Sequence, residues 1–249
     1  MAKPKGLEHF NEYFKDYRSS FVLIGGAGLS VLMDDDKQKF RKTTDLDIVL
    51  LTLASDDFTN HLSQYVEDGG YKTKEASEES PKYYRFLEPT NDLFPEELEF
   101  FSNNETQIQL KSGQYIVPVN KTEGRKISAI LLDDLYFNII KKNIQVGERF
   151  SILNPIGQVC LKARAFREIR ERKEDTKKSD KHRNDIVRIS KLLDGKVKFE
   201  LTGYARTDFE VVLEEISQNV TEIAMQAITG DKKLKKADVI RVLRKTFTD

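Results

Sequence analysis

The chain has 249 residues, of which 39% are hydrophobic and 33% are charged, so it can form one large apolar core or two smaller ones. Its apolar runs are short, and none approaches the roughly 18–20 residues of a membrane span, so we expect no membrane partner. The single cysteine, Cys160, excludes an intramolecular disulfide, and the first residues form no signal-peptide pattern, so we expect a cytoplasmic protein. One cysteine and three scattered histidines also argue against a zinc centre.

Basic and acidic residues balance at 41 each, but they are unevenly distributed along the chain. Residues 1–150 carry 19 basic and 25 acidic side chains, whereas residues 151–249 carry 22 and 16. Within residues 162–191, 12 basic side chains stand against 6 acidic ones. Such an excess is typical of either a phosphate-binding surface or a solvated helical face. On charge alone, we favour the solvated helical face.

The first half of the chain predicts alternating helices and strands. Helices are predicted at residues 7–20, 27–33 and 56–66, the last capped by Ser55 or Asp56. A turn is predicted at residues 69–70, and strands at 21–24, 45–51, 71–74, 82–87, 97–102 and 114–119. These patterns indicate an α/β (α+β) domain with a mixed sheet over residues 1–130.

From residue 131 onward helical periods dominate. Helices are predicted at residues 133–142, 155–173, 181–193, 209–216 and 235–244. The all-polar segment 173–180 predicts a mobile loop, and residues 196–201 predict a short strand. We therefore expect a second, mostly helical domain over residues 131–249.

The feature that indicates chemistry is a glycine pair, Gly25 and Gly26, followed by Asp45 and Asp47 at the start of a predicted strand. Because side chains alternate along a strand, the two aspartates project from one face and the apolar residues next to them project from the other. Paired carboxylates repel each other unless a cation neutralises them, and oxygen ligands suit Mg²⁺ or Mn²⁺. Glycines at a strand-to-helix turn let the backbone approach a phosphate beside the positive end of the helix.

A third carboxylate is expected on the strand predicted at residues 97–102. Glu99 lies between apolar neighbours and is the first choice, while Glu97 shares its face and stays an alternative. Either acid alone would be an ordinary surface residue, and an Asp-x-Asp pair alone is often a strand cap. The combination favours a metal site, because stability alone does not explain paired acids on a packed strand.

These residues resemble the DNA polymerase β-like nucleotidyltransferase superfamily, whose pattern is an apolar residue, Gly-Gly or Gly-Ser, a spacer and Asp-apolar-Asp. A closer resemblance is to the AbiEii-type abortive-infection toxin family, in which an Arg-x-Thr-x-Asp-x-Asp-like stretch precedes a helical half with lysine and aspartate motifs. Residues 41–47 fit that stretch, and residues 161–166 and 181–187 resemble the later motifs. The resemblance covers roughly residues 21–193 and implies a polymerase β-like domain followed by a mostly helical one.

Two departures from the family pattern concern the phosphate contacts. Gly26 stands where many relatives have serine, so a hydroxyl contact to phosphate falls to Ser30 or Thr44. The spacer from Gly26 to Asp45 is also longer than in many relatives.

The resemblance implies transfer of a nucleoside monophosphate from an NTP to an acceptor hydroxyl. Asp45, Asp47 and Glu99 would be catalytic and hold Mg²⁺ or Mn²⁺. The implied nucleotide-binding residues are Gly25, Gly26, Ser30, Arg41, Thr44, Lys162, Lys181 and Asp185. Helical geometry independently predicts that Lys162 and Asp185 point inward, where they could also be an ion pair that only fastens two helices.

The resemblance also implies partners. The acceptor would be RNA, such as tRNA, or a protein, and a toxin of a toxin–antitoxin or abortive-infection system would have a cognate antitoxin. A P-loop ATPase is disfavoured because no Gly-x-x-x-x-Gly-Lys-Ser/Thr sequence occurs. Two alternatives stay open, namely kinase-like phosphoryl transfer on the same fold and a catalytically silent module that binds RNA or a partner through residues 162–191.

Overall fold

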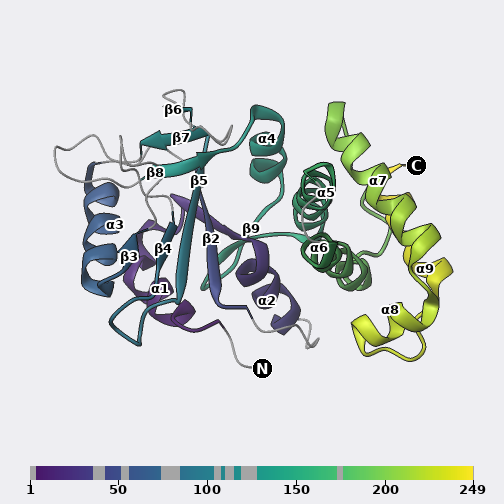
Figure 1. Cartoon of the computed structure of the whole chain (residues 1–249), viewed down its shortest axis with the longest axis horizontal. Coiled ribbons are helices and arrows are strands. Elements are labelled where there is room, and N and C mark those ends of the chain that lie inside the picture. The colour runs from purple at the N-terminus through teal and green to yellow at the C-terminus, as the bar shows by residue number, and fades with distance from the viewer. Residues whose placement is uncertain are drawn as a thin grey trace. The chain divides into compact units, whose positions relative to one another are not determined.

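The computed structural model describes residues 4–35, 43–51, 56–73, 85–103, 108–109, 115–118, 128–172 and 176–248. Their contacts divide the chain into two compact units, residues 1–153 and 154–249. The first unit is mixed α/β and the second is helical (Figure 1). No helix within these described ranges is long and apolar enough to cross a membrane.

The first unit contains short helices and the described strands of one sheet. Its helices are α1 (Leu7–Tyr13), the 3₁₀ turn η1 (Lys15–Tyr17), α2 (Gly25–Asp35), α3 (Asp56–Gly69) and α4 (Asp134–Lys142). Its strands are β1 (Phe21–Ile24), β2 (Asp45–Leu50), β3 (Lys72–Thr73), β4 (Arg85–Leu87), β5 (Glu97–Ser102), β6 (Ile108–Gln109), β7 (Tyr115–Pro118), β8 (Ser128–Leu131), β9 (Ile144–Val146) and β10 (Ser151–Leu153).

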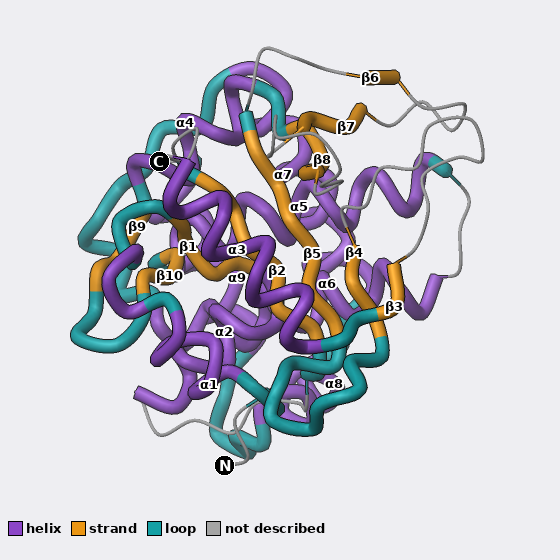
Figure 2. The backbone as a smooth tube through the Cα atoms, turned by 90° about the vertical axis from the view of Figure 1, so that its left-hand side faces the viewer, coloured by secondary structure: helices purple, strands orange, loops and turns teal. Residues whose placement is uncertain are grey.

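The described strands form one mixed ten-stranded sheet. Most of it follows the order β6-β7-β8-β5-β2-β1-β10-β9, while β4 pairs with β5 and β3 pairs with β4 (Figure 2). The central pair, β2 and β5, is parallel, whereas β1 runs antiparallel to β2. Burial alternates along β5, so one face of that strand is packed and the other is partly open.

The packed face of the sheet meets an aromatic core. Phe21 on β1 lies among aromatic rings from α1, from its C-cap Phe14 and from α3. Its ring centroid is 5.4 Å from that of Phe10 on α1 and 5.9 Å from that of Phe14. Phe14 is in turn 5.9 Å from Phe58 on α3. Edge-on ring pairs at this spacing are favourable beyond the area that they bury. In Figure 1, α1 and α3 lie on one side of the strands and α2 lies on the other.

The second unit consists of helices. They are α5 (Pro155–Glu171), α6 (Thr176–Ile189), the 3₁₀ turn η2 (Ser190–Leu192), α7 (Gly203–Asn219), α8 (Glu222–Thr229) and α9 (Lys236–Phe247). Helix α5 starts because Asn154 caps it, accepting a hydrogen bond from the backbone of Gly157, and because Pro155 suits the first turn. Phe209 and Phe247 join α7 to α9, with ring centroids 4.7 Å apart.

The boundary between the units lies later than the one predicted near residue 130. The reason is β10, which pairs in parallel with β1 and so belongs to the sheet of the first unit. The sequence does not predict β10, β9 or α8. The strands at 21–24 and 97–102 have the predicted bounds, and α2 begins at Gly25 rather than at residue 27.

Two local predictions in the second unit are wrong. Residues 176–180 belong to helix α6 rather than to a loop, because Ser179 is buried and Asp180 pairs with Arg183 at 2.9 Å. Residues 173–175, like Ser55, lie outside the described residues. Residues 196–201 form no strand, and the backbone N–H of Phe199 donates to the carbonyl of Thr246 instead.

Candidate functional site

Four carboxylates project from one face of two adjacent strands. Strands β2 and β5 are parallel and in register, so Asp45 lies beside Glu97 and Asp47 lies beside Glu99. Partner residues on neighbouring strands present their side chains to the same face. The leucine between each pair of acids is fully buried, whereas the four acids are partly exposed. These four residues are called the carboxylate row below.

The glycine turn contacts one end of the carboxylate row. Gly25 begins α2 directly after β1 and has a left-handed backbone with φ 59°. A Cβ atom on Gly25 would lie 1.8 Å from Oδ2 of Asp47. Glycine is therefore required for the backbone conformation and also for the close approach of the carboxylate. The carboxylate of Asp47 lies beside the first residue of α2, where the helix dipole favours an anion.

Two threonines precede β2. The hydroxyl of Thr44 donates to Oδ1 of Asp45 at 2.8 Å, and the Thr44 backbone N–H donates to the same oxygen at 3.2 Å. Thr44 therefore orients Asp45 rather than pointing its donor at a phosphate. Thr43 is buried, and its hydroxyl has no hydrogen-bond partner among the described residues. Such a hydroxyl is costly unless a water or ligand oxygen meets it, so it favours a ligand near this end of β2.

Arg85 on β4 belongs to no motif in the sequence, yet it contacts the β5 half of the carboxylate row. Its Nε lies 2.7 Å from Oε1 of Glu97, and its Nη2 lies 3.2 Å from Oε2 of Glu99. The antiparallel register of β4 and β5 places Arg85 directly beside Glu99. Alternation in Arg85-Phe86-Leu87 predicts that Arg85 lies opposite the packed face, but local pattern does not tell which strand it joins.

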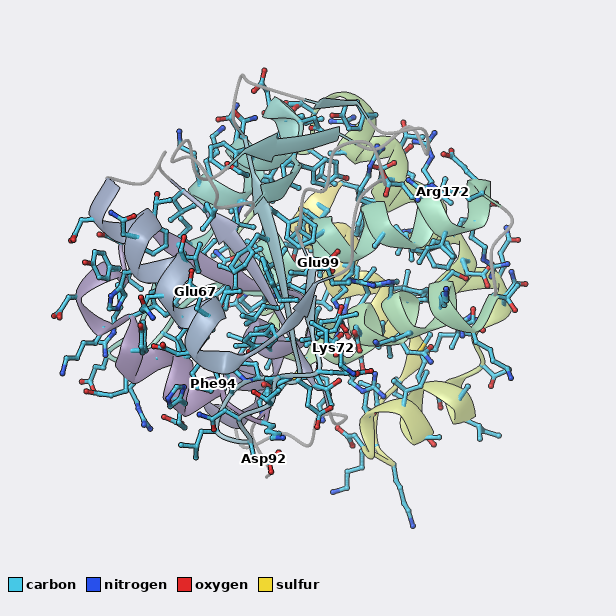
Figure 3. All side chains as sticks on the ribbon, turned by 60° about the vertical axis from the view of Figure 1, so that its left-hand side comes forward. Glu67, Lys72, Asp92, Phe94, Glu99 and Arg172 are labelled. Carbon is cyan, nitrogen blue, oxygen red and sulfur yellow. The ribbon has the colours of Figure 1, made fainter. Side chains whose placement is uncertain are left out.

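Glu99 is more enclosed than Glu97, with 15% of its side chain exposed against 24%. Figure 3 shows Glu99 at the sheet, whereas Asp92 lies out on a surface loop of the same unit. Burial raises the pKa of the Glu99 carboxyl, Arg85 lowers it, and the charge of Asp45 raises it, with a net upward shift. Such a carboxyl suits either a bound cation or acceptance of a proton.

The donor set of the carboxylate row suits a hard divalent cation. Mg²⁺ is usually held by one or two carboxylates together with substrate phosphates and water. Among the described residues, no group of three or more His, Cys, Asp or Glu side chains is arranged to hold a metal ion. Two carboxylates of the row, together with phosphate oxygens and water, would meet the usual requirements of Mg²⁺.

The other predicted nucleotide-binding residues of the first unit differ in their settings. Gly26 follows Gly25 in the first turn of α2. Ser30 lies further along that helix, and its hydroxyl donates to the carbonyl of Ala27 at 2.8 Å, so its proton is already used within the helix. Arg41 lies outside the described residues.

In the second unit, Lys162 and Asp185 form a buried ion pair between α5 and α6. Nζ of Lys162 lies 3.2 Å from Oδ2 of Asp185, and the two side chains are 6% and 0% exposed. The other carboxylate oxygen of Asp185 accepts a hydrogen bond from Arg188 at 3.0 Å. Both side chains point inward, as their helical positions predict. Lys181 is exposed on α6.

The arginines of residues 162–191 contact acidic side chains within the same unit. Arg167 and Arg164 lie 2.8 Å and 3.5 Å from the fully buried Asp208 on α7. Arg170 and Arg183 each lie 3.2 Å from Glu215, about two turns further along α7. These side chains therefore fasten α5 and α6 to α7, which neither the phosphate-binding nor the solvated-face interpretation of the charge excess predicts.

Gln158 on α5 is a polar residue that no motif singles out. It is fully buried, and neither Oε1 nor Nε2 has a hydrogen-bond partner among the described residues. It lies one helical turn before Lys162, so the two side chains share a face of α5. An amide without partners in this position leaves a donor and an acceptor for a ligand or water.

The comparisons with known proteins do not add an identification. No family model and no curated protein matches the sequence. The assignment of function therefore depends on the residues and the geometry described above.

Proposed function

We propose that the protein is a metal-dependent nucleotidyltransferase with a polymerase β-like catalytic domain, which moves a nucleoside monophosphate from an NTP to an acceptor hydroxyl. The observation that carries the proposal is the register of β2 and β5. It sets four carboxylates on one face, and the left-handed turn at Gly25 lies against Asp47 at its end. Carboxylates for a divalent cation next to a glycine turn that can approach phosphates are the parts that such a reaction needs.

In this proposal the first unit supplies the catalytic residues. Asp45 and Asp47 would hold Mg²⁺ or Mn²⁺, and the cation would offset negative charge on the phosphates. Thr44 keeps Asp45 oriented through two hydrogen bonds to one oxygen. Glu99 has a raised pKa, which suits binding the same cation or accepting the proton of the attacking hydroxyl.

The resemblance assigns Lys162, in the second unit, to the negative charge of the triphosphate. Asp185 keeps the Lys162 ammonium in place by a 3.2 Å contact. Arg41 and Lys181 stay candidates for further phosphate contacts.

The resemblance to abortive-infection toxins supports RNA, such as tRNA, or a protein as the acceptor. It also supports a cognate antitoxin as partner. These partners belong to the proposal and depend on the resemblance rather than on a contact in the structure.

The test is transfer of label from each α-labelled NTP, with Mg²⁺ or Mn²⁺, to total RNA or to protein. We expect wild-type protein to label an acceptor, and Asp45→Asn or Asp47→Asn to lower the rate about a hundredfold or more. Asp57→Asn is the matched control, because Asp57 lies on α3 and accepts a hydrogen bond from Tyr17. Equal labelling by all three variants and the wild type would exclude the carboxylate row as the active site.

A further inference from the structure

Arg85 is a cation that the structure places against the carboxylate row. It contacts both β5 acids, at 2.7 Å for Glu97 and 3.2 Å for Glu99. Because β4, β5 and β2 are neighbours in register, Arg85, Glu99 and Asp47 form a line across three strands. The line ends at Gly25, whose Cα is closely approached by Asp47.

The electrostatics of this line require a positive charge. Four carboxylates on one face repel one another, and the register places Asp45 beside Glu97 and Asp47 beside Glu99. Arg85 is partly exposed and offsets part of the negative charge of the row without being buried in the core. A divalent cation at Asp45 and Asp47 would supply more positive charge at the same face, close to Arg85.

We propose that Arg85 is the resident counter-cation of the carboxylate row and that a divalent metal ion competes with its charge at Glu99. The inference rests on the proposed metal site and deepens it by naming a positioning residue. Arg85 offsets part of the negative charge of the row without metal, and its repulsion of the metal lowers the affinity of the row for one.

The two contacts of Arg85 assign different roles to the β5 acids. Glu97 is the more exposed acid and lies at ion-pair distance from the guanidinium. Glu99 accepts a hydrogen bond from Nη2 at 3.2 Å and lies directly beside Asp47. Of the two glutamates, Glu99 is therefore the one at which Arg85 and a metal ion would compete.

The experiment measures Mn²⁺ binding to the full-length chain from the electron paramagnetic resonance signal of free Mn²⁺. We expect Arg85→Met to bind Mn²⁺ at least about fivefold more tightly than the wild type, because a nearby positive charge is gone. Arg85→Gln removes the charge but keeps a hydrogen-bond donor. It should bind Mn²⁺ more tightly by a similar factor, and it replaces Arg85→Met in the test if the Met variant does not fold. Arg85→Lys keeps the charge and should stay within about twofold of the wild type.

Lys72→Met is the matched control. Lys72 on β3 pairs with Glu88 at 2.6 Å, so this variant removes an exposed cross-strand ion pair of the same unit but outside the row. Its Mn²⁺ affinity should equal that of the wild type. If Arg85 only fastens β4 to β5, the Met and Gln variants will lose stability without gaining affinity for Mn²⁺, and the inference is then wrong.

The failure of this inference is distinguishable from that of the proposed function. Mn²⁺ binding that Asp47→Asn abolishes, combined with unchanged affinity in Arg85→Met and Arg85→Gln, overturns the role of Arg85 alone. Absence of Mn²⁺ binding to the wild type, or binding that Asp45→Asn and Asp47→Asn leave unchanged, overturns the metal site and the role of Arg85 together.

Discussion

At the scale of single residues, Gly25 joins the backbone of the glycine turn to the chemistry of the carboxylate row. We expect Gly25→Ala to lose about 1–2 kcal/mol of stability from its left-handed backbone alone. It should also displace Asp47, since the new Cβ would overlap the carboxylate. The transfer rate should therefore fall by more than the loss of folded protein explains. Label transfer measures the rate, and urea unfolding measures the free energy of unfolding.

Gly230→Ala is the control for Gly25→Ala. Gly230 also has a left-handed backbone, with φ 70°, but no atom lies within 4 Å of the position of its Cβ. It should show the same backbone cost with normal activity. If the two variants lose activity to the same extent, the contact between Gly25 and Asp47 has no catalytic role.

Gln158 gives a second prediction at this scale. Replacing its buried amide by leucine, a side chain of similar size, should raise the free energy of unfolding by about 1–2 kcal/mol, because the amide has no partner among the described residues. If the amide serves a ligand, the same variant should bind NTP more weakly in calorimetry. A Gln158→Leu protein that is less stable than the wild type would show that the amide is already hydrogen-bonded.

At the scale of elements, the Lys162–Asp185 pair ties α5 to α6. Asp185→Asn should cost about 3–5 kcal/mol, since the Lys162 ammonium is left buried without this partner, and Lys162→Met should cost less, because Asp185 keeps its contact with Arg188. The double variant should cost less than the sum of the single ones. Urea unfolding of all four proteins measures this coupling, and additive costs would contradict it.

The exposed pair between Lys235 and Glu222 provides the comparison for that cycle. The two groups lie 3.3 Å apart, and both side chains are well exposed. A surface pair of this kind contributes at most about 1 kcal/mol. Equal couplings in the two cycles would mean that burial does not strengthen the Lys162–Asp185 pair.

The sequence predicts some elements better than others, because some depend on local pattern and others on contacts that are distant in the chain. The strands at 21–24 and 97–102 are apolar runs or alternations with clear ends, so local pattern suffices. Strand β10 is only Ser151–Leu153, and its identity depends on pairing with β1, which is distant in the chain. Helix α6 begins in a polar segment because its contacts with other helices, such as Asp180 with Arg170 at 3.6 Å, outweigh composition.

The residues of the candidate site also differ in how far local sequence pattern predicts them. The shared face of Asp45 and Asp47 follows from strand alternation, and so does the shared face of Glu97 and Glu99, which leaves the choice between the two glutamates open. Their alignment across strands depends on register, which short-range pattern does not contain. For the same reason Arg85, which enters from a third strand, could not be predicted.

At the scale of the whole molecule, the division after Leu153 predicts how fragments behave. Residues 154–249 contain their own core and ion pairs, so this fragment should be helical by circular dichroism and should unfold cooperatively. A fragment of residues 131–249 should aggregate more, because β10 is buried in the sheet and would lose its partner β1. A non-cooperative 154–249 fragment would contradict the division.

The central claim is the transfer of a nucleoside monophosphate, and parallel reactions with NTP labelled at the α or the γ phosphorus test it most directly. In nucleotidyl transfer the acceptor hydroxyl attacks the α-phosphorus, the α–β bridging bond breaks and pyrophosphate leaves. The account predicts α-label on the acceptor and γ-label in pyrophosphate, both lost in Asp47→Asn. γ-Label on the acceptor and α-label in a nucleoside diphosphate would show kinase chemistry and contradict the account.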